Sequence, residues 1–357
     1  MSKALQRSVA IAALTAAGLI AAPAGAEETI KMTVSAGHPA VFLWVKHLHE
    51  SFIPTVDAEL AKTGKYKMQW NEAYGSTIAK IGSELETIEQ GISDMGIVGT
   101  VFHSAKMPLQ NVTYQVPFGP DDANVVTAVM DSLHEKLPAM QKAWERYNQV
   151  YMGGFAIDNY GIVTRDPIKK VEDLSGKKLG GAGPNLNWFK GTGAVGVVAS
   201  LNTFYNDIKT GVYDGAIVFA TAAVPAKLYE VAPNYTQVNF GAMYAGGVSV
   251  NKARWDAFPA EVKAAFRAAA KVYGVNYLKE QTARVSASIE AYNKNGGHVA
   301  PLDPAERAKL AKMIPNPSTD WLKLTAEKNL PGKEVLKAYM DGARATGFKF
   351  VRDFDKE

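Results

Sequence analysis

The chain has 357 residues, a formal net charge of +4 and no cysteine. The lack of cysteine excludes disulfides, thiol catalysis and cysteine-based metal sites, and the interspersed charges form no basic patch of the kind that binds nucleic acid. A chain of this length can bury one large core or two medium ones.

The first 26 residues have the pattern of a secretory signal peptide. Lys3 and Arg7 precede an apolar run from Val9 to Ala22, and Ala24-Gly25-Ala26 is a small-residue cleavage site. With these flanks the run is too short for a membrane-spanning helix. We therefore expect residues 1–26 to be removed and the mature protein to work in a bacterial periplasm.

Hydrophobic periodicity predicts alternating strands and helices along the rest of the chain. In the first half, strands are expected at 29–35, 66–70, 95–98 and 151–155, and helices at 40–60, 78–90 and, mainly, 123–147. In the second half, strands are expected at 160–164, from 178, at 197–198 and at 247–251, and helices at 259–293 and 304–313.

One phrase occurs twice. Residues 88–98 and 208–218 both fit Ile-x-x-Gly-(Ile/Val)-x-Asp-x-(Gly/Ala)-Ile-Val. Each copy ends a helical pattern, turns at glycine and enters a short apolar strand. Two such units predict two similar lobes with a ligand cleft between them.

Chain crossings near residues 155 and 245 would make the first lobe discontinuous, as a hinge requires. We expect a two-lobed α/β fold with lobe I at 27–155, to which 246–258 return, and lobe II at 156–245. Residues 259–357 would form a bracing helix and C-terminal helices. The helix at 259–293 would be on the order of 50 Å long, enough to brace both lobes.

No motif in the chain marks a catalytic, nucleotide or metal site. Gly191, Gly193 and Gly196 form a literal G-x-G-x-x-G, but a helical pattern precedes it and a strand follows, the reverse of a dinucleotide site. The six histidines have no metal-ligand spacing, and no nucleophile motif is present. We expect a binding protein without enzymatic activity, cofactor or metal.

Aromatic and polar residues gather near the expected strand ends, where ligands bind in open α/β sheets. The candidate ligand contacts in the first lobe are Phe42, Glu72, Tyr74, Thr100 and Phe102. The candidates in the second lobe are Asp158, Asn159, Tyr160, Asn185, Trp188 and Phe219.

Residues 162–179 resemble the "P-I-…-D-L-x-G-x-K-I" stretch of the periplasmic solute-binding proteins of TRAP transporters, the DctP-like family. The two copies of the repeated phrase, Pro117-Phe118 and the stretch Val250–Trp255 resemble further motifs of that family, in order along nearly all of the mature chain. The resemblance implies a periplasmic binding protein fold whose lobes close over a small molecule. It also implies docking on a membrane permease driven by an ion gradient, with no chemistry. We expect a monomer without a nucleic-acid partner.

The sequence departs from the family pattern at Gly180, where members usually carry an arginine that binds a substrate carboxylate. Either other donors hold an organic acid, or the ligand is neutral or an amine. Donors for an acid would be the backbone of 180–183, Asn185, Asn187 or Lys46; an amine would use Asp158, Asn159, Tyr160 and Glu72, with cation–π attraction from the rings. The rings favour a ligand with an aromatic or apolar body, and the main prediction is a small organic acid. A ligand-sensing subunit for a membrane receptor is the other alternative.

Overall fold

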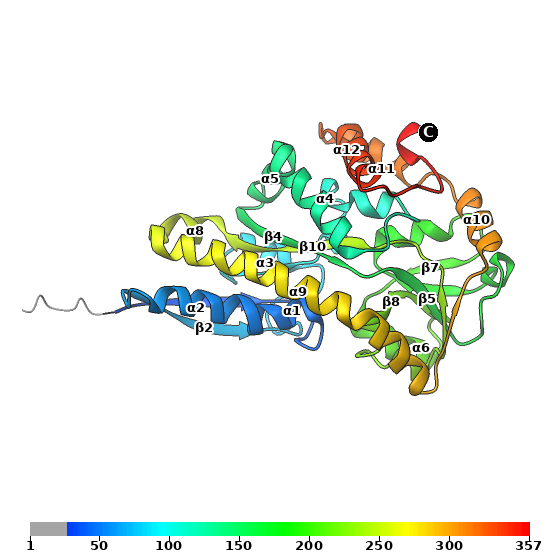
Figure 1. The fold of residues 1–357 in the computed structure, drawn as a ribbon, viewed down its shortest axis with the longest axis horizontal. Coiled ribbons are helices and arrows are strands. Elements are labelled where there is room, and N and C mark those ends of the chain that lie inside the picture. Colours follow the sequence, from blue (N-terminus) through cyan, green and yellow to red (C-terminus); the bar gives the residue numbers. More distant parts are fainter. Residues whose placement is uncertain (1–26) are drawn as a thin grey trace, which may run out of the picture.

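The computed structural model describes residues 27–357, so the predicted signal peptide lies outside the described residues. Two mixed β-sheets form the frame of an elongated molecule (Figure 1). The first sheet has the order β2-β1-β3-β10-β4, with β1 Glu28–Ser35, β2 Tyr66–Ala73, β3 Met95–Val98, β4 Gln149–Ile157 and β10 Met243–Asn251. The second has the order β11-β9-β5-β8-β6-β7, with β5 Tyr160–Thr164, β6 Lys178–Gly181, β7 Val195–Val198, β8 Gly215–Phe219, β9 Asn234–Gln237 and β11 His298–Pro301.

The repeated phrase builds the same unit in both sheets. Helices α3 (Glu84–Glu89) and α6 (Leu201–Thr210) are each followed by a left-handed glycine, Gly91 at φ +71° and Gly211 at φ +81°, a conformation that glycine adopts without steric cost. The strands that follow, β3 and β8, each lie between one parallel and one antiparallel neighbour.

The repeated aspartate has the same role in both copies. The Asp94 carboxylate accepts a hydrogen bond from the Thr33 backbone N–H (2.7 Å), and the Asp214 carboxylate accepts one from the Lys178 N–H (2.8 Å). The backbone N–H of each aspartate donates back to the carbonyl of the same partner. Each aspartate therefore fixes the start of its strand against the neighbouring parallel strand.

The chain passes from one sheet to the other three times; the third crossing lies between β10 and β11, and the first two are hydrogen-bonded to each other. The first crossing lies between β4 and β5, and the second between β9 and β10. The Asn159 side chain accepts a hydrogen bond from the Gly241 N–H (2.9 Å), and the Tyr160 N–H donates to the Gly241 carbonyl (3.1 Å). The two crossings therefore form one hydrogen-bonded connection between the sheets.

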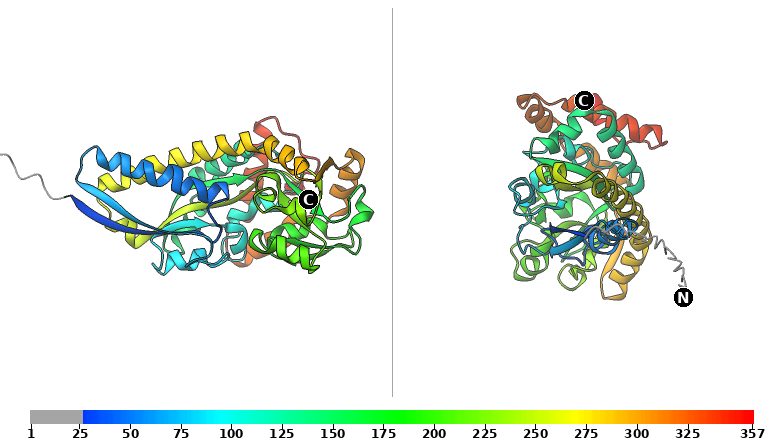
Figure 2. Two further views of the ribbon diagram at one scale, coloured as in Figure 1. Left: turned by 90° about the horizontal axis from the view of Figure 1, so that it is seen from below. Right: turned by 90° about the vertical axis from the view of Figure 1, so that its left-hand side faces the viewer.

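Helix α9 (Ala260–Lys294) runs along the length of the molecule and contacts both lobes (Figures 1 and 2). It packs on α2 (Ile53–Ala61) and β4 at one end, and on α7 (Ala220–Ala223) and β11 at the other. At its middle, the Tyr277 hydroxyl and the Gln281 amide donate to the Ala156 carbonyl (2.7 and 3.0 Å). The predicted long bracing helix is thus present.

Three predicted helices were wrong in extent. Residues 40–60 form α1 (Leu43–His47), a π-helical turn (Leu48–Phe52) and α2. Residues 78–90 are helical only in α3, because the left-handed Gly82 (φ +82°) precedes it. Residues 123–147 divide into α4 (Ala123–Lys136) and α5 (Pro138–Glu145), because Pro138 forces Leu137 out of the helical region (ψ 103°).

The remaining helices complete the two lobes. Helix α8 (Lys252–Ala257) follows β10, and α10 (Pro304–Met313) packs near the second sheet, on the 3-10 turn Val171–Leu174. Helices α11 (Ser318–Glu327) and α12 (Gly332–Ala345) pack with α4 and the 3-10 turn Leu109–Gln115 around a second hydrophobic core. Within residues 27–357, no helix combines the length and the apolar character needed to cross a membrane.

Candidate functional site

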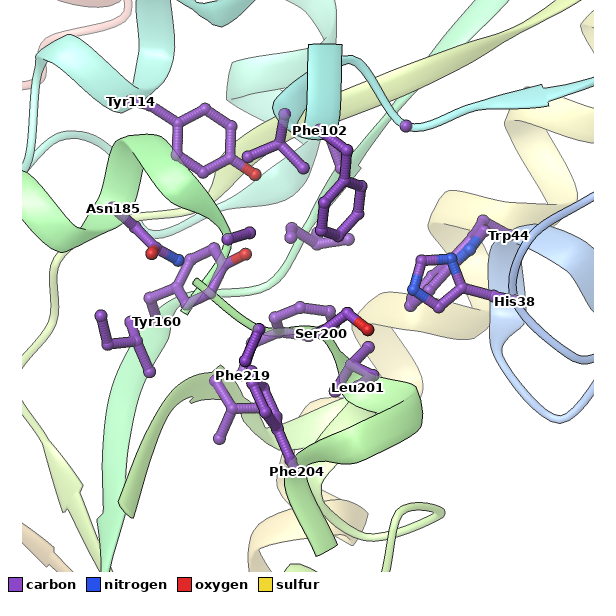
Figure 3. Close-up of a pocket in the computed structure, with 18 of the residues that line it drawn as sticks. His38, Trp44, Phe102, Tyr114, Tyr160, Asn185, Ser200, Leu201, Phe204 and Phe219 are labelled. Atoms are coloured by element: carbon purple, nitrogen blue, oxygen red, sulfur yellow. The ribbon is translucent and has the colours of Figure 1, made fainter. Parts of the chain in front are cut away.

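An aromatic cavity lies between the two sheets, at the ends of the repeated strands β3 and β8 (Figure 3). The empty space inside it and at its open mouth together is about 550 Å³. The first sheet and its loops contribute His38, Trp44, Ile97, Gly99, Val101, Phe102, Tyr114, Phe155, Ile157 and Ala245. The second sheet and its loops contribute Tyr160, Ala182, Asn185, Ala199, Ser200, Leu201, Phe204, Ile217, Val218 and Phe219.

Rings from both lobes meet across this cavity. Trp44 lies on α1 and Phe219 at the end of β8, and their ring centroids are 6.0 Å apart. Trp44 is held in place by stacking between Phe42 (5.1 Å) and Phe155 (5.9 Å). The walls therefore suit an aromatic or apolar body.

Three polar side chains lie together on one side of the cavity: Tyr114, Tyr160 and Asn185 (Figure 3). Both polar atoms of Asn185 and the hydroxyl of Tyr114 are buried without a hydrogen-bond partner. Burial raises the pKa of both tyrosines, so their hydroxyls stay protonated.

His38 lies on the opposite side of the cavity, after the end of β1 (Figure 3). Its Nε2 atom is buried without a partner. Burial lowers the pKa of this imidazole to about 4, so it is neutral at pH 7. It can therefore offer a hydrogen bond to a ligand but no charge.

The first turn of α6 also lines the cavity. Ser200 is the N-cap residue, yet its side chain makes no capping hydrogen bond. Its carbonyl accepts from the N–H groups of Thr203 (3.0 Å) and Phe204 (3.1 Å), and the N–H groups before these have no partner within the helix. Free N–H groups and the helix dipole make such a helix end favourable for an anion.

Among the described residues, no lysine, arginine, aspartate or glutamate lines the cavity. Lys46, on α1, pairs instead with Glu280 (2.7 Å) and Glu50 (3.2 Å). Within residues 27–357, no three histidine or acidic side chains gather in a way that could hold a metal ion. The cavity therefore offers ring faces and uncharged hydrogen-bonding groups.

The family model for DctP, the bacterial extracellular solute-binding proteins of family 7, matches residues 46–320. The chain belongs to the DctP family. A curated relative, a solute-binding protein of Albidiferax ferrireducens, is 22% identical over 227 residues, or 61% of this DctP-family chain and 64% of that relative's length.

Solved structures with the same fold cover the DctP-family chain more fully. A Bordetella pertussis extracytoplasmic solute receptor binding pyroglutamic acid has a TM-score of 0.77 at 19% identity, covering 88% of this chain and 100% of that one. A marine metagenome TRAP solute-binding protein specific for aromatic acid ligands, in complex with 3-hydroxybenzoate, has a TM-score of 0.77 at 17% identity, covering 89% and 99%. A TRAP periplasmic solute-binding protein from Sulfitobacter with bound β-D-galacturonate has a TM-score of 0.74 at 19% identity, covering 87% and 100%. The predicted two-lobed periplasmic binding protein fold is confirmed.

Four of the residues singled out in the sequence line the cavity of this DctP-family protein: Phe102, Tyr160, Asn185 and Phe219. Phe42 and Trp188 lie one layer behind it, where Phe42 stacks on Trp44 and the Trp188 indole donates to the Tyr114 carbonyl (2.9 Å). Thr100 is also outside the lining, and its hydroxyl donates to the Ala245 carbonyl (3.4 Å).

The other four singled-out residues lie elsewhere. Glu72 pairs with the exposed His49 (2.8 Å), and Tyr74 is half-buried outside the cavity lining. Asp158 and Asn159 lie at the first crossing, where the Asp158 carboxylate accepts hydrogen bonds from the Thr221 hydroxyl and N–H.

Sequence reasoning missed His38, Tyr114 and Ser200 as lining residues. His38 carried a usable signal, because it directly follows the first predicted strand. Ser200 also carried a usable signal, because a serine just before a helix is typical of an N-cap residue. Tyr114 lies in a 3-10 turn without a periodic pattern, so nothing local marked it.

The structure leaves no room for a side chain at position 180. A Cβ atom added to Gly180 would lie 2.8 Å from Cε2 of Tyr213 and 3.3 Å from Cε1 of Phe204. Tyr213 is almost completely buried and Phe204 lines the cavity. The space that a longer residue would need is therefore filled by these two rings.

Proposed function

We propose that this protein is the solute-binding subunit of a TRAP-type secondary uptake transporter. In the periplasm it captures a small organic acid with an aromatic or apolar body and delivers it, chemically unchanged, to a membrane permease. It acts as a monomer. Membership of the DctP family supports this proposal, as do the fold neighbours, whose ligands include pyroglutamate, a hydroxybenzoate and a uronate.

One observation carries the choice of an acid: the first turn of α6 lines an otherwise aromatic cavity with its N-cap hydroxyl and first N–H groups free. The ligand carboxylate accepts hydrogen bonds there, and the rings of Trp44 and Phe219 hold its body. In this reading the chain is a member without the usual carboxylate-binding arginine. Two observations support the lack of this arginine. Gly180 stands where the arginine is expected, and no lysine or arginine among the described residues lines the cavity.

An amine ligand is disfavoured by the positions of the acidic residues. Glu72 faces His49 on the exterior, and Asp158 is engaged by Thr221 behind the cavity. An ammonium group in the cavity would meet ring faces but no carboxylate, and would lie against the positive end of a helix dipole.

The binding experiment is a thermal-shift and calorimetric screen of the purified protein against aromatic and apolar monocarboxylic acids. Each acid is paired with the amide and the amine of the same skeleton. A binding acid is expected to add about 2.7 kcal/mol of stability at one hundred times its Kd, whereas its amide and amine add little. Stabilisation by amines alone, or by no acid in the screen, would contradict the proposal.

Ser200→Asp tests the position of the carboxylate. Aspartate caps helices as well as serine does, so the variant is expected to fold with an unchanged or higher Tm. Its negative charge at the helix end should weaken binding of the acid by about tenfold or more. The matched control is Thr203→Asp, which places the same charge on the exposed side of the same turn and should weaken binding less than about threefold because solvent screens it.

Delivery is tested by reconstituting the permease in liposomes. Uptake of the acid identified above should require this protein and an ion gradient, and Ser200→Asp should reduce it at acid concentrations below the variant's Kd. Size-exclusion chromatography with light scattering checks the monomer.

A further inference from the structure

Asn185 and Tyr114 present unused hydrogen-bonding atoms to the cavity. Asn185 is 1% exposed and Tyr114 is 0% exposed, yet Oδ1 and Nδ2 of Asn185 and the hydroxyl of Tyr114 have no partner at hydrogen-bond distance within the protein, although the Tyr160 hydroxyl is a polar neighbour of both residues. Buried polar groups in native proteins are nearly always bonded, because an unpaired one costs free energy. Three such atoms in one cavity wall indicate a group supplied by a ligand.

Both side chains are held where they are by their surroundings. The Tyr114 ring stacks on Trp188 with centroids 6.0 Å apart, and its carbonyl accepts from the Trp188 indole (2.9 Å). Asn185 lies over Gly181, where an added Cβ would come within 2.5 Å of Oδ1. The amide therefore occupies space that only a glycine at position 181 leaves open.

The chemistry of these atoms selects the group that can satisfy them. The Asn185 amide offers donors and an acceptor, and the Tyr114 hydroxyl can do either. A carboxylate can only accept, so it could pair with Nδ2 of Asn185 and the Tyr114 hydroxyl but would leave the Asn185 oxygen unsatisfied, whereas an ammonium can only donate. A hydroxyl or an amide both donates and accepts, so it can pair with this end of the cavity completely.

We propose that Asn185 and Tyr114 are specificity-determining residues that recognise an uncharged hydroxyl or amide group on the ligand, separate from its carboxylate. The inference rests on the proposed function, because the carboxylate is assigned to the Ser200 end. The ligand is then an acid with a second, uncharged polar group across an aromatic or apolar body.

The test compares acids that differ only in that group. Calorimetry measures 3-hydroxybenzoate against benzoate, and pyroglutamate against cyclopentanecarboxylate. In each pair that binds, the acid with the hydroxyl or amide is expected to bind at least about tenfold tighter. Equal affinities within the binding pairs would overturn the inference and leave the proposed function standing, whereas failure of every acid in the wider screen would overturn the proposed function itself.

Variants connect the preference to these two residues. Asn185→Leu and Tyr114→Phe should each reduce the preference, and together they should bring it below about threefold. Tyr114→Phe removes an atom that has no partner in the protein, so its ligand-free Tm should not fall; a lower Tm with an unchanged preference would assign the hydroxyl a structural role instead. The control is Asn187→Leu, which lies in the same turn but outside the cavity lining and should keep the full preference.

Discussion

Asp158 is a buried carboxylate at the first crossing between the sheets. Burial raises its pKa to about 6, above the usual 3.8 of an aspartate carboxyl, although hydrogen bonds from Thr221 act in the opposite direction. Because the folded-state pKa is raised, the stability that the protonated form contributes is complete below about pH 3.8 and is lost as the pH rises through about 6.

Asp158→Asn should therefore gain stability relative to the parent protein as the pH increases. The asparagine keeps the shape of the protonated acid but cannot ionise, so the variant does not lose stability at higher pH as the parent protein does. Thermal unfolding of both proteins at pH 4.5 and 7.5 checks this: the Tm of the parent minus that of the variant should be lower at pH 7.5. A constant difference between the two pH values would show that Asp158 does not titrate in this window.

Single residues also show where sequence reasoning succeeded and where it could not. Asp94 and Asp214 were recognisable as equivalent because they occupy the same position in the two copies of the repeated phrase, although their partners Thr33 and Lys178 lie on other strands. Glu72 and Asp158 look like ligand contacts in the sequence, but their partners, His49 and Thr221, come from other elements. A side chain's partner is decided by tertiary packing, which a single sequence does not encode locally.

At the scale of elements, the long α9 contains a glycine that serves no steric purpose. A Cβ added at Gly274 would meet no atom within 4 Å, and its backbone is ordinary helix. Gly274→Ala should therefore raise the free energy of unfolding by roughly 0.5–1 kcal/mol, because alanine loses less backbone entropy in a helix.

Chemical denaturation measures this change against a matched control in another helix. In α12, a Cβ at Gly342 would lie 2.8 Å from Cγ1 of Val129. Gly342→Ala should therefore be neutral or destabilising despite the same gain in helix propensity. If both substitutions changed stability equally, steric surroundings would not be what separates the two glycines.

Elements were predictable where the local signal was complete. Apart from β9 and β11, which were not predicted, the strands and α9 agree with the apolar patterns, because side-chain periodicity and glycine turns are properties of the chain itself. The break at Leu137 was also visible as the residue before Pro138, but the apolar stripe on both sides concealed it. The cavity as a whole was not predictable, because it joins turns such as Leu109–Gln115 that carry no periodic signal.

At the scale of the whole molecule, the two lobes touch across the mouth of the cavity. The Asn202 side chain, on α6 of the second lobe, donates to the Gly37 carbonyl of the first lobe (3.3 Å). Trp44 and Phe219 meet deeper inside. In the proposed function the lobes close over the ligand, so contacts of this kind would exist only in the closed arrangement and would stabilise it over an open one.

Asn202→Ala should therefore weaken ligand binding several-fold by raising the dissociation rate, with little effect on the association rate. The side chain is exposed and lies outside the cavity lining, so the ligand-free Tm should stay within about 1 °C of the parent value, as is usual for surface substitutions. Stopped-flow kinetics with the acid found in the screen measures both rates. Asn206→Ala, an exposed asparagine one turn further along α6, should leave them unchanged. An unaltered dissociation rate in Asn202→Ala would mean that closure is held by the ligand and the buried rings alone.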